Sequence, residues 1–151
     1  MTENVMTKKI ISIKSEESIK EACKKMLEYD IGLLPVSKDK KLIGVITDRD
    51  IATKVFSNTN SLDVKIEDYI SKNIISCSKD SKLEEVLSIM STNHVKRLIV
   101  LDDKKVVGII SFSDILHHFN DDALLIKTLK EIFSINRNSD EYRTEIDEFY
   151  L

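Results

Sequence analysis

The sequence predicts an α+β fold: two tandem βαββα-type repeats related by a pseudo-twofold axis, followed by a C-terminal helix. The chain matches itself when shifted by 64 positions, and 15 of the 50 residue pairs between 5–54 and 69–118 are identical. Self-similarity at a fixed period marks repeated structural units. One unit of this size buries its faces poorly, whereas two can pack together. We expect repeat 1 over 1–60, repeat 2 over 65–118, and a helix with an acidic tail over 119–151.

Each repeat begins with a short extended segment, Ile10–Ile13 in the first and Ile74–Cys77 in the second. Apolar residues then recur at helical spacing. The start of each helix fits a capping box, in which a hydroxyl and a carboxylate satisfy free backbone amides. These predicted boxes are Ser18 with Glu21, and Ser81 with Glu84.

Two apolar strands follow the first helix of each repeat. Their nearly continuous Val, Ile and Leu residues are typical of strands covered on both faces: Ile31–Val36, Leu42–Thr47, Val95–Leu101 and Val106–Ser111. A second helix is expected to start near Asp48 and again near Ser113. The polar run 57–61 predicts a linker. Asp121 or Asp122 is expected to cap the final helix.

The composition is that of an ordinary soluble protein, and the cysteine usage fits a reducing cytoplasm. The 151 residues carry a net charge of −3, with 42% hydrophobic and 32% charged residues, which argues against a nucleic-acid partner. Cys23 and Cys77 form no disulfide framework and are expected to be buried free thiols. No apolar run approaches the length of a membrane span. Without a recognisable nucleophile–base pair or metal cluster, the sequence predicts a non-enzyme with no catalytic residues, no metal ligands and no catalytic cofactor.

Two of the three glycines open the same motif, Gly44–Asp50 and Gly108–Asp114, where a strand ends and a helix begins. Free amides and the Thr or Ser hydroxyl there can hold a phosphate. An ionised Asp can accept both hydroxyls of a ribose, and the Gly permits close approach of a ligand. A hydroxyl residue three positions before an Asp is equally an ordinary helix cap. The residues alone leave these two interpretations open.

The segments Ile31–Val36 and Gly44–Asp50, with their counterparts in repeat 2, resemble the CBS (cystathionine β-synthase) domain family, whose tandem pairs are called Bateman modules. The opening Val5–Thr7 also looks like the start of that family. The resemblance implies two clefts, a disk-like homodimer, and regulatory binding of AMP, ADP, ATP or S-adenosylmethionine. Pro35 has Ile99 as its counterpart and Phe112 replaces a polar residue, so equal occupancy of the clefts is not expected.

The resemblance also implies that each cleft joins the strand-to-helix motif of one repeat to early strand residues of the other. The first cleft would combine Val45, Thr47, Arg49 and Asp50 with Ile75, Val95, Lys96 and Arg97. The second would combine Ile109, Ser111, Ser113 and Asp114 with Lys9, Ile11, Ile31 and Gly32. In the first, Asp50 would hold the ribose, Ile75 and Val95 would flank the adenine, and Lys96 and Arg97 would meet phosphates. The guanidinium favours this cleft for a polyphosphate.

The alternative function is a structural or protein-interaction module with unoccupied clefts. It would act through dimerisation or through the C-terminal helix, expected over 121–135. An apolar stripe on a helix more often packs against the core of its own chain. No motif in the sequence names the regulated protein target.

Overall fold

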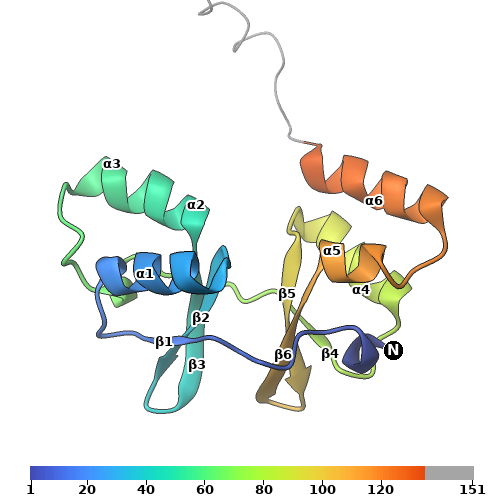
Figure 1. Cartoon of the computed structure of the whole chain (residues 1–151), viewed down its shortest axis with the longest axis horizontal. Helices are drawn as coiled ribbons and strands as arrows, with labels where there is room; N and C mark the ends of the chain where they lie inside the picture. The colour runs from blue at the N-terminus through green and yellow to red at the C-terminus, as the bar shows by residue number, and fades with distance from the viewer. Residues whose placement is uncertain (135–151) are drawn as a thin grey trace, which may run out of the picture.

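The computed structural model describes residues 1–134, which form two repeats lying side by side (Figure 1). Repeat 1 contains β1 (Ile13–Lys14), α1 (Ile19–Tyr29), β2 (Leu33–Lys38) and β3 (Lys41–Thr47). Repeat 2 contains β4 (Ser76–Ser78), α4 (Leu83–Asn93), β5 (Arg97–Asp102) and β6 (Lys105–Ser111). Each sheet has three strands in sequence order, the first pair parallel and the second antiparallel. The predicted fold class is confirmed.

The helices that follow β3 and β6 differ in length. In repeat 1 the chain runs through α2 (Asp48–Asp50), a π-helical turn (Ile51–Val55) and α3 (Phe56–Asn58) without a break. In repeat 2 the corresponding helix α5 (Phe112–Leu116) stops early, and α6 (Asp122–Phe133) begins after a short turn. Among the described residues, no helix is long and apolar enough to cross a membrane.

The caps of the longer helices were only partly predicted. Ser18 caps α1, because its Oγ accepts from the Glu21 amide at 3.3 Å. The Glu21 carboxylate does not complete the box and accepts from Lys24 at 2.7 Å instead. As expected, Asp121 caps α6, its Oδ1 accepting from the Leu124 amide at 2.9 Å.

The capping box predicted for Ser81 and Glu84 is wrong by one residue. The N-cap of α4 is Lys82, and the Glu85 carboxylate accepts from the Lys82 amide at 3.1 Å. The 64-residue shift places this pair opposite the cap of α1. The 64-residue shift therefore predicts the position of this cap correctly, whereas the local Ser–Glu pattern does not.

A short segment near the start of each repeat pairs with a strand of the other repeat. Thr7 exchanges backbone hydrogen bonds of 2.9 and 3.0 Å with Ile109 on β6, and Ser71 exchanges bonds of 2.9 and 3.0 Å with Val45 on β3. Positions 7 and 71 are 64 residues apart, as are 45 and 109. The two pairings are thus exchanged by the pseudo-twofold axis. We call 5–7 and 69–71 the crossing segments.

Each repeat has its own core, and residues outside its expected bounds complete it. Ile66 is fully buried in the core of repeat 1, and Met6 lies in the core of repeat 2. Leu125 and Ile132 bury α6 in the core of repeat 2, so this helix packs against its own chain. Cys77 lies in the same core, where burial raises the pKa of its thiol to about 11.

The crossing segments also account for the two repeated glycines. A Cβ on Gly44 would lie 2.8 Å from the carbonyl oxygen of Ser71, and a Cβ on Gly108 would lie 3.0 Å from that of Thr7 and 2.5 Å from Met6 Sδ. Neither glycine has a left-handed φ. The two glycines thus permit the close approach of a crossing segment of the chain itself.

Candidate functional site

The two junctions between strand and helix have the same local geometry. At the first, Asp50 Oδ2 accepts from the Thr47 amide at 3.0 Å and from Thr47 Oγ1 at 2.7 Å, while Thr47 Oγ1 accepts from the Asp50 amide at 3.1 Å. At the second, Asp114 Oδ2 accepts from the Ser111 amide at 2.8 Å and its hydroxyl at 2.6 Å. Both carboxylates are therefore helix caps, as one interpretation of the motif held. A ligand that leaves the caps intact can reach only Oδ1.

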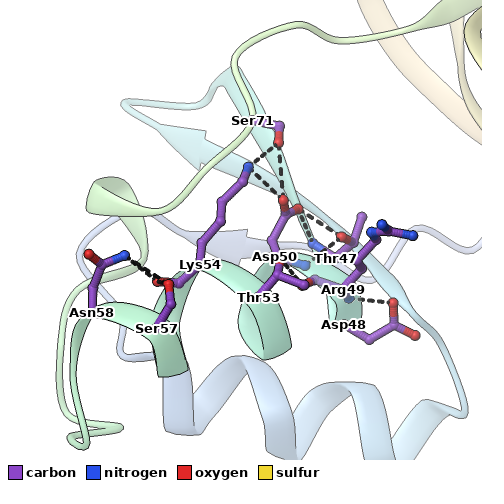
Figure 2. Close-up of polar contacts among 9 residues, drawn as sticks. All are labelled: Thr47, Asp48, Arg49, Asp50, Thr53, Lys54, Ser57, Asn58 and Ser71. Carbon is purple, nitrogen blue, oxygen red and sulfur yellow. Dashed lines mark hydrogen bonds and ion pairs between the residues drawn. The ribbon is translucent and has the colours of Figure 1, made fainter. Parts of the chain in front are cut away.

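At the first junction, Oδ1 is already occupied by the protein. Lys54 Nζ lies 2.6 Å from Asp50 Oδ1, and Ser71 Oγ donates to the same oxygen at 3.4 Å. Figure 2 shows both side chains directed at the Asp50 carboxylate. Asp50 is 8% exposed. The Asp50 carboxylate is thus fully engaged.

These contacts also set the ionisation of Asp50. Burial raises the pKa of Asp50, but hydrogen bonds from Lys54 and Thr47 together outweigh burial and hold it below its ordinary value of 3.8. A lowered folded-state pKa gives stability that is present above the unfolded value and is lost as pH falls through the folded value.

We therefore expect Lys54→Met to raise the pKa of Asp50 and to reduce its acid-sensitive contribution to stability. The measurement is an NMR titration of the Asp50 carboxyl carbon, with urea unfolding between about pH 2 and 6. The other carboxylates contribute equally to the pH dependence of stability in both proteins, so the difference between variant and wild type reports on Asp50. Identical Asp50 titration curves in the two proteins would contradict the role given to Lys54.

At the second junction, Oδ1 of Asp114 has no hydrogen-bond or ion-pair partner among residues 1–134. The counterpart of Lys54 is His118, whose Nδ1 contacts the backbone oxygen of Asp114 at 2.9 Å and not the carboxylate. Ser113 Oγ lies 2.8 Å from Ser111 Oγ. The Ser111 hydroxyl is already engaged, because it donates to Asp114 Oδ2 and accepts from the Asp114 amide at 3.2 Å. This junction therefore offers one carboxylate oxygen, with the Ser113 hydroxyl nearby.

Two basic residues where β5 begins, Lys96 and Arg97, lie beside this second junction. Arg97 is in register with Ser111 across β5 and β6, and the Lys96 carbonyl accepts from the Phe112 amide at 2.8 Å. Both side chains belong to exposed residues. The family resemblance groups them with Asp50 of the other repeat, and the hairpin also places them next to the Asp114 motif of their own repeat. The backbone of Arg97 is thus paired with the second junction.

The remaining predicted residues are spread around the two sheets. Arg49 is exposed and points away from Asp50 (Figure 2). Lys9 Nζ lies 5.7 Å from the ring centroid of Tyr29, and the Gly32 carbonyl accepts from the Asp48 amide at 3.2 Å. The apolar candidates pack on the two cores or pair with the crossing segments: Ile11, Ile31, Val45, Ile75, Val95 and Ile109.

Within residues 1–134, no hydrogen bond joins the two halves of either predicted cleft. Two surface hollows of about 630 and 540 Å³ lie elsewhere: one is beside 59–63, and the other is lined by Lys54, Asn58, Asp68, Tyr69 and Ile70. The motifs in the sequence did not single out Ser71 or Lys54. The i,i+4 spacing of Asp50 and Lys54 was the available signal for the latter.

Both repeats match the CBS domain family model, over residues 3–57 and 66–121. The chain is 36% identical over 114 residues to uncharacterized protein MJ1232 of Methanocaldococcus jannaschii, covering 75% of this chain and 37% of that protein. It is 34% identical over 116 residues to inosine-5'-monophosphate dehydrogenase of the same organism, covering 76% of this chain and 22% of the enzyme. The chain thus spans well under half the length of these two relatives.

A solved structure with the same architecture is the CBS domain pair of protein MJ0100 in complex with 5'-methylthioadenosine and S-adenosyl-L-methionine. It superposes with a TM-score of 0.71 at 31% identity, covering 79% of this chain and 94% of that one. The family match covers both repeats, and the shared fold agrees with it. The chain therefore belongs to the CBS domain family and carries a tandem pair of these domains.

Proposed function

We propose that this CBS pair is a regulatory module that binds an adenine nucleotide at the junction of β6 and α5. The observation that carries the proposal is the open Oδ1 of Asp114, with Arg97 in register with Ser111. A carboxylate oxygen accepts strongly from ribose hydroxyls. The Arg97 guanidinium offers a fork of donors suited to a phosphate. The adenosyl ligands named for the MJ0100 pair support the same ligand class.

The charges around this junction favour a nucleotide over S-adenosylmethionine. Lys96 and Arg97 carry two positive charges at the start of β5 and are both exposed, with Lys96 Nζ 5.2 Å from the ring centroid of Phe133. A phosphate is attracted to such a pair, whereas the sulfonium of S-adenosylmethionine carries a positive charge and is repelled. AMP, ADP and ATP are therefore the expected ligands.

Isothermal titration of the whole chain with AMP, ADP, ATP and S-adenosylmethionine tests the proposal. We expect saturable binding of at least one nucleotide at sub-millimolar concentration, about the range that metabolite sensors need. Absence of binding for all four compounds at about 1 mM would overturn the proposed function.

The phosphate contact has its own test in Arg97→Gln. We expect this variant to bind ATP about tenfold more weakly, the loss typical of one hydrogen bond to a charged group. Its affinity for adenosine, which lacks phosphates, is expected to stay unchanged. Arg49→Gln is the matched control, because Arg49 is the exposed arginine of the other junction. Equal losses in both variants would point to a general effect of charge.

Regulation requires that the ligand bind two states of the module with different affinity. A homodimer is part of this proposal, since the family resemblance implies a disk of two pairs. Sedimentation equilibrium with and without ATP measures both the oligomeric state and any coupling to the ligand. A monomer at all concentrations would remove the dimer from the proposal and leave the ligand site untouched.

A further inference from the structure

We propose that Lys54 acts as a built-in occupant of the first junction and limits each chain to one adenine nucleotide. This inference rests on the proposed function, and it concerns which of the two junctions is open. The two junctions share one backbone geometry. They differ in what lies against the second oxygen of the capping carboxylate.

The contacts at the first junction form a closed set of three polar groups. Lys54 Nζ contacts Asp50 Oδ1 at 2.6 Å and donates to Ser71 Oγ at 3.0 Å, and Ser71 Oγ donates to Asp50 Oδ1 at 3.4 Å. Figure 2 shows these contacts meeting on one side of the carboxylate. Oδ1 is the oxygen that a ribose would need, because Oδ2 is held by Thr47.

The ammonium is a stronger partner for this oxygen than a sugar hydroxyl. The side chain of Asp50 is only 12% exposed, so its charge is poorly solvated. A ribose that displaced Lys54 would replace a charged donor by neutral ones and would leave the carboxylate uncompensated. The first junction therefore disfavours the ligand even where its shape would admit one.

Repeat 2 shows the same scaffold without this occupant. His118 stands at the position of Lys54, but it contacts the backbone oxygen of Asp114. In addition, α5 ends at Leu116, whereas the repeat-1 helix continues past Lys54 to Asn58. Both the residue type and the helix length leave Asp114 Oδ1 accessible.

Native mass spectrometry at saturating ATP, AMP or S-adenosylmethionine counts bound ligands per chain and tests the inference. We expect one ligand for the wild type and two for Lys54→Met. The double variant Lys54→Met, Asp50→Ala is expected to return to one, which assigns the new site to Asp50. Lys54→Arg keeps the cation and is expected to bind one.

The matched control is Lys24→Met. Lys24 also forms a short ion pair, 2.7 Å from Glu21, but on the exposed side of α1. This variant carries the same change in net charge and is expected to bind one ligand. Circular dichroism of all variants verifies that they are folded, and Lys54→Gln provides a second neutral variant should Lys54→Met fold poorly.

The possible outcomes separate the two proposals. One ligand in the wild type and one in the folded neutral variants would overturn the role of Lys54 and leave the proposed function standing. Two ligands bound to the wild type would also overturn the role of Lys54 and leave the proposed function standing. No ligand in any protein would overturn the proposed function, and the inference about Lys54 with it.

Discussion

Replacing Asp114 by alanine is expected to weaken adenine-nucleotide binding by about 10- to 150-fold, corresponding to the loss of 1.5–3 kcal/mol from hydrogen bonds to a charged group. The reason is that Asp114 Oδ1 is the carboxylate oxygen left open at the second junction. Titration calorimetry of both proteins with ATP measures the change. Asp114→Asn is expected to recover part of the affinity, because it keeps an acceptor but loses the charge.

Asp50→Ala is the matched control for this experiment. It removes the same kind of helix cap, which costs about 1 kcal/mol of stability, and it does not touch the second junction. We expect its ATP affinity to equal that of the wild type. If Asp50→Ala lost affinity for ATP and Asp114→Ala did not, the nucleotide would bind at the first junction, and our proposal would be wrong.

The largest effect on stability is expected from Gly44→Ala, at about 2–3 kcal/mol, as for overpacking of a filled site. The new Cβ would meet the Ser71 carbonyl at 2.8 Å and Ile70 at 3.1 Å. Because the nearest atom belongs to the backbone, the crossing segment must move and its hydrogen bonds with Val45 must weaken. Urea unfolding of the variant measures the loss.

The other two glycines provide graded controls. At Gly108 the nearest atom is the flexible end of Met6, so we expect a smaller cost of about 1–2 kcal/mol. At Gly32 the nearest atoms belong to the side chain of Asp48, which is exposed and can rotate away. Gly32→Ala is therefore expected to lie within about 0.5 kcal/mol of the wild type. A different order of the three variants would show that the crossing segments do not press on the sheets.

The repeat made most of the fold predictable. Residues that align under the 64-residue shift occupy equivalent places, and the apolar runs became strands within one or two residues of their expected ends. The first extended segment is the exception, since β1 begins only at Ile13, three residues after its expected start at Ile10. A short strand that pairs on one side leaves a weak pattern, because few of its side chains are buried.

The site was less predictable, because it depends on pairing between distant segments. Nothing in the local pattern of Thr7 or Ser71 indicates that these residues pair with the opposite repeat. The position of Arg97 was accessible from the sequence, since the hairpin between β5 and β6 sets it opposite Ser111. The family resemblance grouped Arg97 with Asp50 of the other repeat, and that grouping stays a prediction.

Because each crossing segment pairs with the opposite repeat, this chain has the connectivity of two single-repeat molecules that exchange segments and are joined end to end. A fragment holding one repeat alone would keep its own crossing segment, which pairs with the other repeat. It would lack the crossing segment that pairs with its own sheet, so a second molecule would have to supply that segment. Two such fragments could then trade strands and rebuild the pair without a covalent link.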